Sequence, residues 1–433
     1  MRAFHMSWLA FFSVFFAWFG IAPLMPLVRD DLGLTQSQIG NTIVASVAAT
    51  VFIRILIGPL CDRYGARTVY SLLLIVGSIP VMTIGLADSY TSFLLFRLAI
   101  GGVGAAFVVT QYHTSVMFAP NIVGTANATT AGWGNLGGGV TQIVMPMIVA
   151  GLVALGATTE EGWRLTMVVP GVVLLVLGAA YYLLTQDAPG GNHRDLRRLR
   201  DTHEKPRLSG KASFRTAAGD SRVWALFVAY AACFGLELTL NNIAVLYFHD
   251  RFTLNLGTAG LIAGVLGMMN IFARTLGGWL SDRRGGRHGP VGRVHLLFAV
   301  LLAEGIALIA FSRMGVLVAA VATLMLCSLF IQMACGATFG LVPFVNRKAI
   351  GSVSGIVGAG GNVGAVLAGF LFGVESLGYD RIFLYLGIAV VLASAVSLLI
   401  RFTPAEMMTV EEGNAPSNAA GTTLAEKSLV GVG

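Results

Sequence analysis

Twelve apolar stretches, each about as long as a bilayer is thick, occupy most of the chain. A hydrocarbon core of about 30 Å is crossed by roughly 20 helical residues. The stretches are residues 8–28, 39–60, 69–87, 92–117, 125–153, 165–184, 222–248, 258–280, 293–312, 315–343, 349–374 and 380–402. With 56% hydrophobic and only 11% charged residues, the 433-residue chain is not soluble. The sequence predicts an all-α membrane protein with twelve transmembrane helices.

A charged motif occurs twice, with every matched position 220 residues apart. Arg54 lies within the apolar run VASVAATVFIRILIGPL, and Arg274 lies within AGVLGMMNIFARTLGGWL. Each arginine is followed at the same spacing by Gly-x-x-x-Asp-Arg-x-Gly-x-Arg, from Gly58 and from Gly278. Such internal repeats are typical of transporters built from two related halves. We therefore predict two six-helix halves.

The halves are predicted to be residues 1–184 and 222–402, joined by a basic linker at 185–221. The connections after even-numbered stretches hold most of the basic residues, whereas the other connections mix arginine with acidic residues. By the positive-inside rule, both termini and the linker are predicted to be cytoplasmic. The Gly/Ala/Ser-rich tail, 403–433, is predicted to be disordered. Because no basic stretch is long enough to fold as a domain, the net charge of +7 does not indicate nucleic-acid binding.

The two intramembrane arginines predict an anion site. An ionised side chain at membrane depth is costly and is usually functional. Arg54 and Arg274 occupy equivalent places in the two halves, so we expect an empty central cavity to hold two positive charges. In the alternative interpretation, Arg54 reaches the cytoplasmic interface, since it lies one turn before Gly58.

Two glycine-rich segments each contain an asparagine. Residues 131–139 read AGWGNLGGG, and residues 358–365 read GAGGNVGA. No strand precedes either segment and no Gly-Lys-Ser/Thr follows, which argues against a phosphate loop. We expect close helix packing or gating at both segments; in the alternative, the asparagines are incidental. The candidate residues are Gly132, Gly134, Asn135, Gly137, Gly360, Gly361, Asn362 and Gly364.

These motifs resemble known transporters. The repeated loop resembles that of the major facilitator superfamily and predicts a cytoplasmic latch, the alternative being a simple basic anchor; its residues are Asp62, Arg63, Arg67, Asp282, Arg283 and Arg287. The paired glycine-asparagine segments resemble the nitrate/nitrite porter family, closest to the branch of plant-type high-affinity nitrate transporters. The resemblance implies the major facilitator fold and secondary active transport of nitrate, and also of nitrite.

The resemblance also implies a substrate site. Beside Arg54 and Arg274, it assigns Asn135 and Tyr230 as neutral hydrogen-bond donors, and it places the Phe107 and Phe234 rings above and below a flat anion. Glu237 is the candidate for proton coupling, and a structural role is the alternative. Glu304 and His113 are weaker candidates.

Three modes of action remain open at this stage: proton-coupled nitrate uptake, nitrate/nitrite antiport, and nitrate sensing through the basic linker. No catalytic, cofactor or metal constellation occurs in the sequence, so we expect neither an enzyme nor a cofactor. The four cysteines show no metal-ligand spacing and are predicted to be buried. The expected partners are nitrate, nitrite, protons and the lipid bilayer, and the expected state is a monomer in the cell (inner) membrane.

Overall fold

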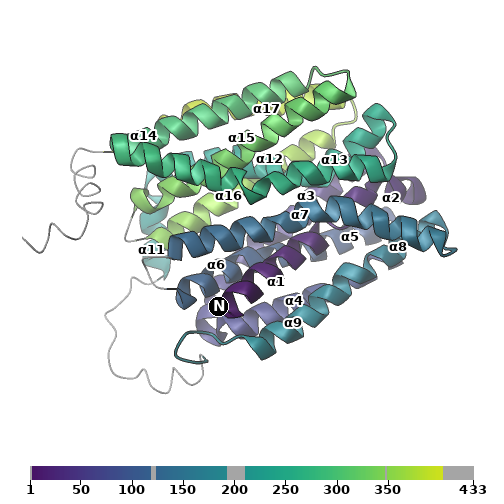
Figure 1. Cartoon of the computed structure of the whole chain (residues 1–433), viewed down its shortest axis with the longest axis horizontal. Helices are drawn as coiled ribbons and strands as arrows, with labels where there is room; N and C mark the ends of the chain where they lie inside the picture. Colours follow the sequence, from purple (N-terminus) through teal and green to yellow (C-terminus); the bar gives the residue numbers. More distant parts are fainter. Residues whose placement is uncertain (1, 119–122, 193–209, 347–348, 403–433) are drawn as a thin grey trace, which may run out of the picture.

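A computed structural model describes residues 2–118, 123–192, 210–346 and 349–402. Almost all of them are helical, and long helices run side by side in two bundles (Figure 1). The predicted tail, 403–433, and residues 193–209 of the predicted linker lie outside the described residues.

The N-terminal bundle contains the helices before the linker. These are α1 (Arg2–Trp18), η1 (Ala22–Leu24), α2 (Met25–Leu32), α3 (Gln36–Tyr64), α4 (Ala66–Thr83), η2 (Ile84–Leu86), α5 (Tyr90–Gly101), η3 (Gly102–Ala105), α6 (Ala106–Met117), α7 (Val123–Ala154), α8 (Thr159–Thr166) and α9 (Val168–Leu184). Several of them are short because Pro23 and Pro26, or glycines such as Gly102 and Gly104, interrupt a single span.

The C-terminal bundle contains the helices after the linker. These are α12 (Ser221–Phe252), α13 (Leu256–Met268), η4 (Met269–Ile271), α14 (Ala273–Phe311), α15 (Leu317–Val345), α16 (Ile350–Phe372) and α17 (Tyr379–Ser397). Along the chain, the short helix α11 (Gly210–Ala218) lies between the two bundles. It belongs to the predicted linker, and the apolar pattern of the sequence did not predict it.

The helices confirm the predicted all-α membrane fold. Ten helical segments of the described chain are long and apolar enough to span a bilayer. One of them, Leu256–Phe311, comprises two spans, because Gly289 has φ of +60° and Pro290 follows it. Together with α3, which is 29 residues long, these segments account for all twelve predicted spans.

The two bundles meet at the end opposite the linker, which we call the distal end. There Arg29 Nη1 lies 2.8 Å from Asp250 Oδ1, and the Tyr379 hydroxyl donates to Asp250 Oδ2 at 3.0 Å. Gln36 Nε2 donates to the main-chain oxygen of Leu377 at 3.0 Å. Gly40 and Gly373 touch backbone to backbone, so that a Cβ on Gly40 would overlap Gly373. These contacts close the distal end.

We predict that Arg29→Ala loosens this end. The variant loses the Arg29–Asp250 ion pair, whose side chains are 28% and 24% exposed. Such a pair contributes about 1 kcal/mol or less, so its loss should change the ratio of open to closed molecules by at most a few-fold. Spin labels at Leu155 and Val316, which are exposed at the distal ends of the two bundles, should then report a longer or broader distance distribution. Arg251→Ala is the matched control, because Arg251 pairs with Asp380 inside the C-terminal bundle at 3.6 Å. Equal distributions for both variants would contradict the prediction.

Candidate functional site

Arg54 lies between the bundles without an acidic partner among the described residues. Its Nη2 is 3.4 Å from the oxygen of Gly104, in the 3₁₀ turn η3, and its Nη1 is 3.5 Å from the oxygen of Gly358 in α16. The Nε atom is buried and has no hydrogen-bond partner. The guanidinium carbon lies 5.3 Å from the centre of the Phe107 ring. Arg54 therefore retains hydrogen-bonding capacity for an anion.

Arg274, by contrast, is surrounded by partners. Its Nη2 is 2.6 Å from Glu237 Oε2, and its Nε donates to Gln332 Oε1 at 3.2 Å. The Asn135 amide, with its oxygen toward Arg274, accepts from Nη1 at 2.5 Å and from Nη2 at 3.3 Å. The guanidinium carbon lies 5.7 Å from the centre of the Phe234 ring. Helices of both bundles thus hold Arg274 in place.

This pairing corrects the expected charge of the site. The sequence predicted two uncompensated positive charges, on Arg54 and Arg274. In the structure the Glu237 carboxylate neutralises Arg274, so Arg54, Arg274 and Glu237 together carry a net charge of +1. Glu237 is only 4% exposed, and its other oxygen accepts from Asn270 Nδ2 at 2.9 Å. The proton-coupling candidate and the substrate candidate are therefore one ion pair.

Sequence reasoning missed two residues of this network, Asn270 and Gln332. Asn270 lies four residues before Arg274, at the 3₁₀ turn η4, and Gln332 is an isolated polar residue within the apolar α15. A polar side chain at membrane depth is itself a signal of function. That signal would have identified both.

Aromatic rings accompany both arginines. Phe107 lies beside Arg54, and Phe234 lies beside Arg274. Tyr230 stacks on Phe234, with ring centres 4.9 Å apart and planes 11° from parallel. The structure therefore groups the six predicted substrate residues into two sets, one around Arg54 and one around Arg274.

The predicted glycines lie where helices touch. In α7, a Cβ on Gly134 would overlap the Phe11 ring and one on Gly137 the main-chain oxygen of Phe12, both in α1. In α16, side chains on Gly360, Gly361 and Gly364 would overlap α12. Gly132 is less restricted, with only the Asn270 oxygen nearby at 3.9 Å.

Asn362 and Arg54 both approach the main-chain oxygen of Gly358. Asn362 Nδ2 is 3.5 Å from the Gly358 oxygen, which is also the oxygen nearest Arg54 Nη1. Its Oδ1 is buried and has no hydrogen-bond partner.

The repeated loop motif makes contacts within each bundle. Asp282 Oδ1 lies 2.6 Å from Arg293 Nη1, Arg283 lies over the Trp279 ring, and Arg287 is exposed. In the first copy, the Arg67 main-chain N–H donates to Asp187 at 2.8 Å, and its Nε donates to the Tyr182 oxygen at 2.6 Å. The side chains of Asp62 and Arg63 lie outside the described part of the structure. A latch between the bundles stays a prediction.

Two weaker proton candidates occupy different environments. Glu304 is fully buried, and neither of its carboxyl oxygens has a hydrogen-bond partner among the described residues. His113 contacts the Tyr181 hydroxyl and, through Nε2, the main-chain oxygen of Gln186 at 2.8 Å. Neither joins the Arg274 network.

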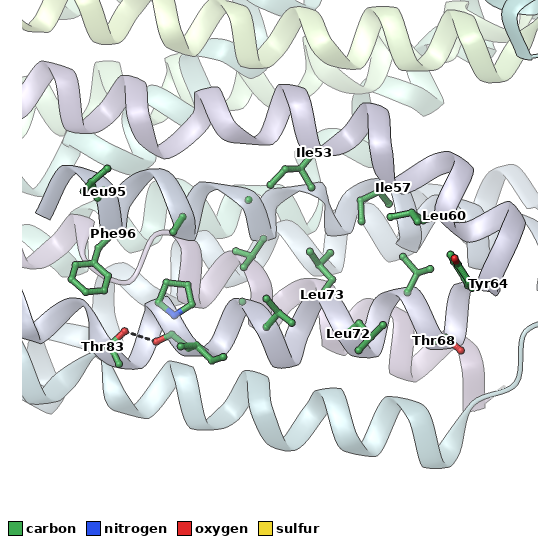
Figure 2. A pocket seen from close by; sticks show the side chains of 18 of the residues that line it. Ile53, Ile57, Leu60, Tyr64, Thr68, Leu72, Leu73, Thr83, Leu95 and Phe96 are labelled. Atoms are coloured by element: carbon green, nitrogen blue, oxygen red, sulfur yellow. Dashed lines mark hydrogen bonds between the residues drawn. The ribbon is translucent and has the colours of Figure 1, made fainter. Parts of the chain in front are cut away.

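An apolar cleft of about 930 Å³ lies on the side of the N-terminal bundle (Figure 2). Ile53, Ile57 and Leu60 of α3 face Leu72 and Leu73 of α4 across it. Lacking any charged lining residue, it does not suit a small anion.

Comparisons with known proteins show similarity to a family of membrane transporters. The sequence profile of the Major Facilitator Superfamily matches residues 7–346. High-affinity nitrate transporter 2.3 of Oryza sativa subsp. japonica is 41% identical over 373 residues, covering 86% of this chain and 72% of the relative. High affinity nitrate transporter 2.5 of Arabidopsis thaliana is 40% identical, covering 86% and 74%. Nitrate/nitrite transporter NrtP of a Picosynechococcus strain is 31% identical, covering 84% and 83%.

Solved structures agree on the fold. A bacterial homolog of the human lysosomal transporter Spinster, in an inward-facing and unoccupied conformation, superposes with a TM-score of 0.72 at 17% identity. The match covers 93% of this chain and 98% of that one. A D-xylose-proton symporter gives a TM-score of 0.70 at 14% identity, covering 94% and 98%.

We predict that Gly364→Val destabilises the protein, because its Cβ would overlap the Ala231 backbone of α12. Overpacking of this kind costs about 1–3 kcal/mol. Gly355→Val in the same helix is the control, since no atom lies within 4 Å of a Cβ there. Thermal unfolding in detergent, followed by tryptophan fluorescence, should show a lower midpoint for Gly364→Val alone. Equal midpoints would show that close approach at Gly364 is dispensable.

Proposed function

Because the chain belongs to the nitrate/nitrite porter family of the major facilitator superfamily, we propose that it carries nitrate, and also nitrite, across a membrane. The proteins of this family are transporters and not enzymes. One observation carries the proposal: two arginines from different bundles lie at the bundle interface, and Arg54 keeps a buried N–H without a partner. The names of the relatives agree with this substrate class.

The chemistry of nitrate matches the Arg54 set. Nitrate is a flat monoanion whose charge is spread over three oxygens, and guanidinium donates two parallel hydrogen bonds to such an edge. The Nη atoms of Arg54 lie 3.4 Å from the Gly104 oxygen and 3.5 Å from the Gly358 oxygen, which are long hydrogen bonds. A bound anion would replace them with shorter, charge-assisted hydrogen bonds to the guanidinium. The Phe107 ring beside Arg54 favours a flat anion over a tetrahedral one.

Transport proceeds by alternating access between residues 1–184 and 222–402. The closed distal end supports this view, since Arg29, Gly40 and Asp250 hold the two bundles together there. With both termini on the cytoplasmic side of the cell membrane, the distal end faces outward and the site opens inward. The Spinster homolog with a similar fold is also inward-facing. The protein acts as a monomer within the bilayer.

The Glu237–Arg274 pair supports proton coupling of transport. Uptake of one anion against an inside-negative potential costs about 2.3 kcal/mol per 100 mV, so roughly two protons must accompany each nitrate. A proton on Glu237 removes the charge that holds Arg274 Nη2 at 2.6 Å and releases this guanidinium for nitrate. Protonation and nitrate binding then favour each other, which is the differential interaction that coupling requires.

The first test replaces each arginine by lysine. A point charge does not reproduce a planar fork, so we expect Arg54→Lys and Arg274→Lys each to lower nitrate uptake by proteoliposomes about tenfold or more. Arg313→Lys, at an exposed position outside the bundle interface, should transport like the wild type. Uptake no faster than in empty liposomes for the wild type, or wild-type rates in both site variants, would refute nitrate carriage by these arginines.

The second test separates symport from exchange. Glu237→Gln should abolish the acceleration of nitrate uptake by an imposed proton gradient, because its amide does not take up a proton at neutral pH. Glu304→Gln should keep that acceleration, since Glu304 lies outside the Arg274 network and its carboxyl oxygens have no hydrogen-bond partner among the described residues. Nitrate uptake into nitrite-loaded vesicles reports whether each variant is folded. A wild type that responds to internal nitrite and not to the gradient is an exchanger.

A further inference from the structure

A small polar cavity lies on the distal side of the Glu237–Arg274 pair. Its volume is about 20 Å³, and its polar lining comes from both bundles: Gln142, Glu237, Asn241, Asn270, Ser328 and Gln332. Asn241 and Ala244, which also line it, follow Glu237 along α12 toward the distal end. The cavity therefore lies between Glu237 and the distal face.

Two buried oxygens in this lining have no hydrogen-bond donor. They are Gln142 Oε1 and Asn270 Oδ1. Both amide groups are fixed by their nitrogens, since Gln142 Nε2 donates to the Asn241 oxygen at 2.8 Å and Asn270 Nδ2 donates to Glu237 at 2.9 Å. A buried acceptor without a donor costs about 1–3 kcal/mol. The occupant of the cavity must therefore donate hydrogen bonds.

We propose that one water molecule occupies this cavity and is the last carrier of the proton that reaches Glu237 from the distal side. This inference rests on the proposed proton coupling. A water needs roughly 10–15 Å³ and two to four polar partners, and the cavity supplies both. Its two hydrogens point to Gln142 Oε1 and Asn270 Oδ1.

The transfer balances. A hydronium ion in the outer solution passes a proton to the cavity water, and this water passes one of its protons to a Glu237 carboxylate oxygen, so two O–H bonds break, two form, and a neutral water remains in the cavity. Glu237 becomes neutral, and its ion pair with Arg274 is lost. Asn270 bonds both the water and Glu237, and so it positions the carboxylate toward the donor.

A metal cation fits the cavity less well. Hard cations require about six oxygen ligands, whereas the cavity offers two unpartnered amide oxygens and a carboxylate already bonded to Arg274 and Asn270.

The cavity is sealed by contact between the bundles. Gln142 belongs to α7, whereas Asn241 and Asn270 belong to the C-terminal bundle. On the distal side of Gln142, Gly260 of α13 approaches α7 so closely that a Cβ on it would overlap the Gln142 main-chain oxygen. Opening of the distal end separates these helices and connects the water to the outer solution. Proton loading is thereby confined to the outward-open state.

Two variants test the inference in proteoliposomes. Ala244→Val fills the cavity with two methyl groups, and Gln142→Met removes one acceptor at similar side-chain length. Each should lower proton-gradient-driven nitrate uptake about tenfold or more, while nitrate/nitrite exchange stays within about twofold of the wild type. Ala150→Val, an exposed site on α7, is the matched control and should change neither activity. Replacing sodium by choline should leave uptake unchanged.

The outcomes are distinct. Wild-type exchange without any response to a proton gradient would refute the proposed coupling and this inference with it. A proton-driven wild type whose Ala244→Val and Gln142→Met variants behave identically to it would overturn the inference alone, and a requirement for sodium would replace the water by a cation. If both variants lose exchange as well, a high-resolution map of the wild type decides: density between Gln142 and Asn270 supports the water, and an empty cavity overturns it.

Discussion

The buried ion pair between Glu237 and Arg274 is the interaction on which the centre of this protein depends. Its side chains are 4% and 13% exposed, and removing one partner of such a pair leaves an uncompensated buried charge that costs about 3–5 kcal/mol. Asn135, Asn270 and Gln332 complete the hydrogen bonds of the pair from three other elements. Any change in the charge of Glu237 therefore alters contacts in both bundles at once.

The repeated sequence motif suggests two equal arginines, but the fold makes them unequal. Among the described residues, Arg54 contacts two main-chain oxygens and the Phe107 ring, whereas Arg274 contacts a carboxylate and two amide side chains. In our proposal the two arginines therefore have different roles. Arg54 can bind an anion at all times, whereas Arg274 can bind one only when Glu237 is protonated. A symmetric pair of cations would bind anions without responding to protons.

The sequence predicts the twelve spans, their order and the duplication, because span length and apolar composition are set by the bilayer and not by tertiary contacts. It also selects several of the residues that cluster around the two arginines, but it misses Asn270 and Gln332. It does not reveal the bond between Glu237 and Arg274, since these residues are 37 positions apart on different helices and meet only when α12 and α14 pack. The sequence also did not predict helix α11 in the linker or the 3₁₀ turns η3 and η4. These elements are short, and the neighbouring helices determine their geometry.

Beside the side-chain contacts of Arg29, Gln36 and Tyr379, the distal end is closed by backbone against backbone where Gly40 meets Gly373. A gate made of side chains opens when a few rotamers change, but backbone against backbone leaves nothing to rotate. Opening must therefore displace α3 and α16 along their length, and every residue packed on them shares the cost. The rate of turnover is then a property of the whole interface, so substitutions far from the ion site will change speed without changing what is carried.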